Sequence, residues 1–478
     1  MSRWAAPQSP ESWSIPRPTN AFGPCCPQPL SPFTDIGGQE NNIAEDCLSL
    51  NVWSPVGASN LPVLVYVHGG GFVTGCSARE RYHGAFVAGS ASTVVVTINY
   101  RLGVFGFLAG RELSGNYGIL DQQYALKWVQ KNIAVFGGDP TRVTLDGQSA
   151  GAISVATHLS MPSTISNRHF RAAIMQSNPI LMQFRTLANQ QPQYDVFSSA
   201  VGCGFASSRL DCMRELTWET LLGYQNWGVA PFVLNNTWQN VIYKLPWAPT
   251  VDGSLITQTP STAFQTGTFY QVPIVLGTVA NETTGFLPLA FGEGPGGVIF
   301  GGIFYNTGLD TLFGTSLANK IRALYPSTRT NSEDALGRAM TDFAFVCPVL
   351  KSATWISQYV PAYVYQMTHA PTCDPNNYQH AICKGRACHS ADVDFVFHTI
   401  SLDRRGNCNW TPAESDLSWE MLQAWTNFTA NPTSISNLPR WNGKDLLQFD
   451  LPSKLSSNTA ANSNCDFWYD VAYGKITN

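Results

Sequence analysis

The residue most suggestive of chemistry in this sequence is a serine in a glycine-rich turn. Ser149 lies in Gly147-Gln148-Ser149-Ala150-Gly151, directly after an apolar run at residues 143–145 and before a run with helical spacing at residues 152–159. A strand, a sharp turn and a helix in this order hold a serine exposed as a nucleophile. Side chains at the two glycine positions would obstruct the turn. The pattern predicts a nucleophilic Ser149, and an ordinary surface turn is the alternative.

A second glycine-rich motif could stabilise the charge that such a nucleophile creates. The sequence HGGGF, residues 68–72, follows residues 61–67, an apolar run typical of a buried strand. Attack on a carbonyl produces an oxyanion, which backbone N–H groups can stabilise. We expect the N–H groups of Gly70, Gly71 and Ala150 to do so. A flexible linker is the alternative, but a linker does not lie between a buried strand and an aromatic residue.

The order of the motifs resembles that of the type-B carboxylesterase and lipase family, the cholinesterase-like branch of the α/β-hydrolases. The resemblance extends almost from end to end of the chain. Besides HGGGF and the serine motif, its blocks are residues 45–52, 94–108, 116–122 and 136–140. The resemblance implies an α/β-hydrolase fold, in which a central, mostly parallel sheet is flanked by helices and carries helical and loop insertions.

The elements expected around the motifs agree with that fold. Strand-like runs at residues 61–67, 94–98 and 142–145 alternate with helix-like segments such as residues 121–134. This alternation indicates parallel strands joined by helical crossovers. A chain of 478 residues could form several average domains or one large domain. We expect a single domain over residues 1–478, because no repeat or low-complexity tract divides the chain.

Composition restricts the possible partners. Charged residues make up 13% of the chain and the net charge is −4, so no basic surface for nucleic acid or anionic membrane is indicated. No apolar stretch approaches the ~18 residues of a transmembrane helix. We therefore expect a small, largely uncharged substrate, no nucleic-acid partner and no integral membrane segment. The sequence leaves open whether the protein is a monomer or a homo-oligomer.

Two further residues complete the expected catalytic triad. In this fold an acid and then a histidine follow the nucleophile along the chain. Residues 388–397 resemble the family's histidine loop, and residues 275–286 resemble the strand and turn that carry its glutamate. The resemblance implies that His389 is the general base and that Glu282 orients it. Less favoured alternatives are His369, His380 and His398 as the base and Asp252 and Asp310 as the acid.

The expected reaction is acyl transfer through a covalent acyl-enzyme. Ser149, activated by His389, would attack an ester carbonyl, expel an alcohol and then be released by an activated water. This chemistry needs no metal and no organic cofactor. A structural zinc site is the alternative use of one cysteine- and histidine-containing loop, with Cys373, His380, Cys383, Cys388 and His389 as its ligands.

Departures from the family pattern bear on the substrate. Gln148 stands where cholinesterases carry a glutamate that favours cationic substrates, and the 27–46 loop contains no tryptophan and is short for a lipase lid. We expect an esterase for soluble short- to medium-chain or aromatic esters. Gln148, Phe72 and Phe286 are the expected pocket residues, although each phenylalanine could simply pack. A lipase for longer acyl chains and a non-catalytic adhesion or binding module are the alternatives.

The twelve cysteines favour disulfide bonds and a secreted or otherwise extracytoplasmic protein. The resemblance implies the pairs Cys26–Cys47 and Cys203–Cys212, and Cys383–Cys388 could tether the histidine loop. Partners for four cysteines stay open, namely Cys347, Cys373, Cys408 and Cys465, and Cys25 and Cys76 are unassigned. The chain starts without a recognisable signal peptide, and the family's N-terminal β-hairpin is not recognised either. We therefore expect the first strands of the family fold to be missing from this sequence.

Overall fold

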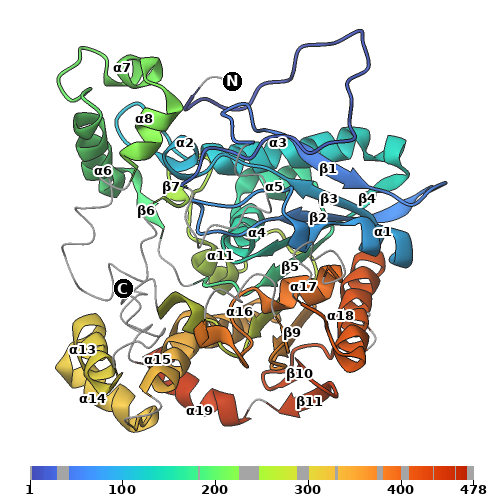
Figure 1. Ribbon diagram of the computed structural model, residues 1–478, viewed down its shortest axis with the longest axis vertical. Coiled ribbons are helices and arrows are strands. Elements are labelled where there is room, and N and C mark those ends of the chain that lie inside the picture. Colours follow the sequence, from blue (N-terminus) through green and yellow to red (C-terminus); the bar gives the residue numbers. More distant parts are fainter. Residues whose placement is uncertain are drawn as a thin grey trace.

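A nine-stranded sheet forms the centre of the computed structural model (Figure 1). The structure describes residues 3–29, 42–180, 184–225, 247–287, 301–328, 332–373, 381–399, 408–433, 435, 437–457 and 459–470. In spatial order the strands of the sheet are β1 (Leu50–Trp53), β3 (Val94–Ile98), β2 (Leu61–Val67), β4 (Gly138–Gln148), β5 (Ala172–Gln176), β8 (Ile274–Val279), β9 (Ala362–Met367), β10 (Asp445–Phe449) and β11 (Lys454–Ser457). A separate parallel pair joins β6 (Arg185–Thr186) to β7 (Thr250–Val251).

The sheet is parallel from β3 to β10 and antiparallel only where β1 and β11 pair at its two edges. Its inner strands are buried on both faces. Along β2, Val63, Val65 and Val67 join one cluster of buried side chains, whereas Leu64 and Tyr66 join another. Both faces need apolar residues in such a strand, so it reads as a continuous apolar run. The predicted α/β fold is confirmed.

Helices cover both faces of the sheet (Figure 1). One layer consists of α3 (Tyr117–Asn132), α4 (Ala150–Ser160) and α16 (Cys347–Ile356), and the other of α1 (Ala85–Ala91), α17 (Ala391–Phe397) and α18 (Pro412–Ala430). The remaining described helices are α2 (Gly103–Phe107), α5 (Pro162–Asn167), α6 (Leu187–Ala200), α7 (Arg209–Glu215), α8 (Trp218–Gly223), α11 (Pro260–Thr266), α13 (Gly301–Phe313), α14 (Thr315–Leu324), α15 (Ser332–Thr341) and α19 (Thr459–Trp468).

The strand and helix boundaries predicted from the sequence agree best with those of the structure where an element is wholly apolar. The expected strands at residues 61–67 and 94–98 coincide with β2 and β3. The third expected strand is only the middle of β4, which begins at Gly138 and continues to the residue before Ser149. The helix expected at residues 121–134 begins earlier, at Tyr117, because Asn116 adopts a left-handed conformation (φ 61°) that starts α3 there.

All twelve cysteines are paired. The three expected pairs are present, and the cysteines without an assigned partner form Cys25–Cys76, Cys347–Cys465 and Cys373–Cys408. The zinc alternative is wrong, because disulfide formation removes the thiolates of its three cysteines. In the part of the chain that the structure describes, no helix has both the length and the apolar character needed to cross a bilayer.

Candidate active site

Ser149 lies at the tight junction between β4 and α4. Its backbone has φ 57° and ψ −120°, a conformation that a non-glycine residue adopts only when its surroundings impose it. A Cβ added at Gly147 would collide with the carbonyl oxygen of Gly151, and one added at Gly151 would collide with that of Val67. The Ser149 N–H donates to the carbonyl oxygen of Gln176 on β5 at 2.9 Å. The two glycines therefore let the chain turn closely enough to present Ser149.

Glu282 and His389 meet at the same end of the sheet. The Nδ1 atom of His389 lies 2.5 Å from Oε2 of Glu282, and Oε1 of Glu282 accepts the N–H of Val279 at 2.8 Å. Glu282 is fully buried, and the His389 side chain is 10% exposed. Because the carboxylate accepts a hydrogen bond from Nδ1, the neutral imidazole carries its proton there and a lone pair on Nε2.

The loops that carry these two residues are joined directly. Asn281 forms a β-bridge with Cys388, and its N–H donates to the carbonyl oxygen of Ala387 at 2.9 Å. The Cys383–Cys388 disulfide closes the loop before His389. Backbone pairing and a covalent bond thus hold Glu282 and His389 in register.

The second nitrogen of His389 contacts Gln148. The Nε2 atoms of the two side chains are 3.0 Å apart, and Gln148 is buried. Among the described residues, Oγ of Ser149 makes no hydrogen bond. A catalytic hydrogen bond often forms only when substrate is present, so this geometry is compatible with proton transfer from Ser149 to His389.

The HGGGF loop passes close to Ser149. A Cβ added at Gly69 would lie 3.1 Å from Cβ of Ser149. Gly70 and Gly71 have φ values of 111° and 61°, in the region that favours glycine. Within the described residues, the N–H groups of Gly70, Gly71 and Ala150 donate to no acceptor. Three unused donors therefore belong to the two segments that meet at Ser149, as an oxyanion hole requires.

His68 anchors this loop and was not assigned a role from the sequence. It is buried, its ring stacks on Tyr100 with centroids 4.5 Å apart, and its Nδ1 lies 2.8 Å from the carbonyl oxygen of Gly69. Burial lowers the pKa of His68 to about 4. His68 is therefore neutral at physiological pH and fixes the start of the glycine loop rather than exchanging protons.

The aromatic residues around His389 differ from those expected. Phe72 is fully buried and packs against Phe107 with ring centroids 5.0 Å apart, which agrees with the packing role that was the alternative to a place in the substrate pocket. Phe286 is 40% exposed and its ring lies 5.0 Å from that of His389. Phe345 lies 5.1 Å from the same ring and was missed, because it is carried by a π-helix, Asp342–Val346, whose sequence resembles an ordinary apolar helix.

The alternative acids and bases are engaged elsewhere. His369 contacts Glu414 at 3.1 Å, and His398 contacts Ser418 at 2.8 Å. Asp252 accepts a hydrogen bond from Asn116 at 2.9 Å, and Asp310 forms an ion pair with Arg322 at 2.8 Å. His380 lies outside the described residues. Of the histidines that the structure describes, His389 combines a buried carboxylate partner with a position beside the serine turn.

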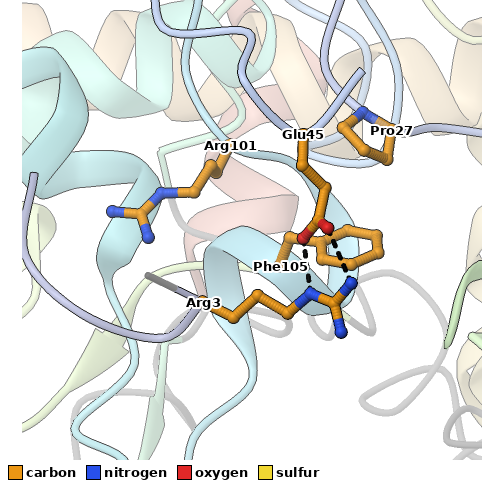
Figure 2. Close-up of a pocket in the computed structure, with 5 residues that line it drawn as sticks. All are labelled: Arg3, Pro27, Glu45, Arg101 and Phe105. Atoms are coloured by element: carbon orange, nitrogen blue, oxygen red, sulfur yellow. Dashed lines mark hydrogen bonds and ion pairs between the residues drawn. The ribbon is translucent and has the colours of Figure 1, made fainter. Parts of the chain in front are cut away.

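No metal site emerges elsewhere in the described regions. No group of three or more histidine, cysteine, aspartate or glutamate side chains in them is arranged to hold a metal ion. Figure 2 shows a small pocket lined by Arg3, Pro27, Glu45, Arg101 and Phe105. Arg3 pairs with Glu45 at 2.6 Å, and Arg101 pairs with Asp121 at 2.6 Å. Because its charged groups are already paired, we assign this pocket no ligand.

The sheet order, the serine turn after a central strand and the histidine–carboxylate pair define an α/β-hydrolase. The chain belongs to the carboxylesterase family, whose sequence model matches residues 1–468. It is therefore a carboxylic-ester hydrolase, and the resemblance described from its motifs is confirmed.

Several characterised proteins are similar over most of the chain. Para-nitrobenzyl esterase of Bacillus subtilis (strain 168) is 32% identical over 92% of this chain and 86% of its own length. The crystal protein of Dictyostelium discoideum is 32% identical over 99% and 86%, and acetylcholinesterase of Bungarus fasciatus is 30% identical over 90% and 73%. A solved structure of PNB esterase superimposes with a TM-score of 0.77 at 29% identity, covering 97% of this chain and 91% of that chain.

Proposed function

We propose that the protein is a serine esterase in which Ser149 is the nucleophile, His389 the general base and Glu282 the acid that orients it. The observation that carries this proposal is the 2.5 Å contact between His389 and the fully buried Glu282, next to a serine in a strained turn. Buried carboxylates are stable when they are hydrogen-bonded and paired with a group that gains positive charge. Glu282 would stabilise the imidazolium that forms when His389 takes the serine proton.

The reaction proceeds in two halves. In the first, Oγ of Ser149 bonds to the ester carbonyl carbon, its proton moves to Nε2 of His389, and the alcohol leaves with that proton. In the second, a water gives one proton to Nε2 of His389 and its oxygen bonds to the acyl carbon. The bond between that carbon and Oγ then breaks, Oγ of Ser149 takes the proton back from His389, and the carboxylic acid leaves. The N–H groups of Gly70, Gly71 and Ala150 stabilise the oxyanion in both halves, and each such donor contributes about 10²–10³-fold to the rate.

The substrates that this site favours are soluble short- to medium-chain or aromatic esters. Phe286 and Phe345 place apolar rings beside His389, which suits an apolar acyl or alkoxy group. Gln148 places a neutral amide before the nucleophile, so no carboxylate at that position attracts a cationic substrate. The six disulfides favour an oxidising, extracytoplasmic compartment.

The direct test is hydrolysis of p-nitrophenyl acetate and butyrate by the wild-type protein and by Ser149→Ala. We expect the variant to lose at least ~10³-fold in kcat/KM, because no nucleophile remains. A fluorophosphonate should label the wild-type protein on Ser149 and leave the variant unlabelled. If the wild-type protein is as inert as the variant and takes no label, the esterase mechanism is wrong and a binding role replaces it.

The substrate class needs a separate test. A panel of acetyl, butyryl, octanoyl, benzoyl and hydroxycinnamoyl esters should show kcat/KM highest for one of the short, medium or aromatic acyl groups. Emulsified triolein tests the lipase alternative. A rate that rises sharply above the solubility limit of triolein would indicate interfacial activation and contradict the proposed preference for soluble esters.

A further inference from the structure

The contact between Gln148 and His389 engages the atom that the proposed reaction needs. Because Nδ1 of His389 donates to Glu282, its Nε2 carries the lone pair, and the Gln148 amide nitrogen 3.0 Å away must be the donor. The same lone pair has to accept the proton of Ser149. Gln148 and Ser149 therefore compete for one acceptor in the free enzyme.

The Gln148 side chain is held in this position by its surroundings. It is the last residue of β4 and is 4% exposed, and it pairs in register with Gln176 on β5. A Cβ added at Gly69 would lie 2.8 Å from both the backbone oxygen and the side-chain oxygen of Gln148. The amide thus lies packed between the glycine loop and the imidazole, and a buried amide N–H in such a place needs an acceptor.

We propose that Gln148 is a positioning residue that holds the His389 ring by donating to Nε2, and that it thereby weakens the base until substrate enters. This inference rests on the proposed function. A hydrogen bond to the neutral form of a base disfavours its protonation. Substrate binding has to free Nε2 from the amide before the serine proton is transferred, and the amide keeps both of its own protons throughout. A glutamate at this position could not donate when ionised and would favour the imidazolium instead.

Few other charged groups in the described part of the chain face the imidazole. Glu282 contacts Nδ1 from the loop after β8, and Asp392 acts on the ring electrostatically from α17. Asp392 accepts hydrogen bonds from Tyr365 at 2.6 Å and Gln176 at 3.2 Å, and burial raises its pKa. The aromatic neighbours of the ring are uncharged. Substitutions at residue 148 leave these groups in place, so a changed pH dependence reports on the side chain at residue 148, and Gln148→Met isolates the loss of the amide donor.

The test compares Gln148→Met, which has similar length but no donor, with Gln148→Glu, which is charged and accepts only. The measurement is kcat/KM for p-nitrophenyl butyrate between pH 4 and 9. We expect the acidic midpoint of the profile to lie at higher pH in both variants, by about half a unit for methionine and about one unit or more for glutamate. Gln123→Met is the control, because this buried amide donates to Ser163 at 2.7 Å and not to His389. Its midpoint should equal that of the wild type.

A methionine variant with the wild-type midpoint would overturn the inference, because Gln148 would then only fill space. The pH dependence of the rate of fluorophosphonate labelling gives the same midpoint from very little folded protein, so poor expression of one variant does not remove the test. The proposed function fails separately, namely if the wild-type protein neither hydrolyses the ester nor takes the label. An active wild-type protein with unshifted variants contradicts only the role of Gln148.

Discussion

At the scale of single residues, the backbone conformation of Ser149 depends on a neighbouring glycine that has no Cβ. Its φ of 57° and ψ of −120° cost about 1–3 kcal/mol relative to a relaxed backbone. The close approach of Gly151 to the end of β2 holds this conformation, and only a residue without a Cβ permits that approach. Packing around a glycine thus stabilises the strained backbone of Ser149, and contacts of the serine side chain do not.

This dependence predicts opposite effects for two glycine substitutions. Gly151→Ala introduces a Cβ that collides with the Val67 carbonyl. We expect this variant to lose about 1–3 kcal/mol or more in the free energy of unfolding and to have no esterase activity. Gly89→Ala, in the exposed part of α1, meets no atom within 4 Å. It should raise the free energy of unfolding by about 0.5–1 kcal/mol and leave activity unchanged. Urea unfolding and ester hydrolysis measure both, and equal stability of the two variants would refute the steric argument.

The sequence predicted some residues of the candidate site and missed others. Ser149, Glu282 and His389 could be selected from local motifs, because each lies in a characteristic block of sequence. Phe345 could not, since its position beside His389 depends on how α15 and α16 pack against distant segments. Phe72 follows the glycine loop in the sequence, but its backbone has φ 63° and its ring is buried against Phe107. Adjacency along the chain did not indicate the direction of its side chain.

At the scale of elements, α18 supports the histidine loop through its N-terminal cap. Thr411 and Glu414 form a capping box, and Glu414 also accepts hydrogen bonds from Thr372 at 2.6 and 2.7 Å and contacts His369. Burial alone would raise the pKa of Glu414, but these hydrogen bonds outweigh it and lower the pKa to about 2. The start of α18, which packs on α17 directly after His389, therefore depends on one ionised carboxylate.

The sign of this shift predicts a pH effect on stability. A carboxyl group with a lowered pKa in the folded state stabilises the protein above its unfolded pKa, near 4.5, and this stabilisation disappears as the pH falls toward 2. We expect Glu414→Gln to lose about 1 kcal/mol at pH 7 and progressively less below pH 4.5. Urea unfolding between pH 2.5 and 7 measures the difference. Glu420→Gln, in the same helix outside the cap, is the control. A loss that is independent of pH would contradict the role given to the charge.

The elements themselves were predictable to different degrees. β2 and β3 coincide with the expected strands because burial on both faces makes their sequences uniformly apolar. The beginning of β4 was missed because Asp139, Pro140 and Thr141 are polar or turn-forming residues that pairing with β2 at Leu61 draws into the strand. Such pairing is a long-range property, so a local pattern does not reveal it.

At the scale of the whole molecule, two disulfides are expected to contribute differently, one mainly to global stability and the other mainly to activity. Cys347–Cys465 connects residues 118 apart and joins α16 to α19, whereas Cys383–Cys388 spans only five residues beside His389. A disulfide lowers the entropy of the unfolded chain, and the loss grows with loop length. On this basis Cys347–Cys465 adds about 5 kcal/mol to the free energy of unfolding and Cys383–Cys388 adds about 2 kcal/mol. The long link therefore contributes mainly to global stability, and the short link to the shape of the active site.

Replacing each pair by alanines tests this division. Cys347→Ala with Cys465→Ala should lower the free energy of unfolding by the larger amount and leave kcat/KM near the wild-type value where the protein is folded. Cys383→Ala with Cys388→Ala should lower kcat/KM at least tenfold with a smaller loss of stability. Thermal unfolding and ester hydrolysis of the two double variants provide the comparison. A short-link variant with full activity would show that backbone pairing alone holds the histidine loop.

The wide separation of the three proposed catalytic residues along the chain has a consequence for biosynthesis. Ser149 lies in the first third of the chain, whereas Glu282 and His389 are themselves 107 residues apart and lie far downstream. A nascent chain that has emerged only as far as α4 holds a serine with neither a base nor an oriented carboxylate. Under the proposed mechanism, translation thus delivers the nucleophile first and the groups that activate it last, and we expect a partly synthesised chain that ends at α4 to hydrolyse no ester.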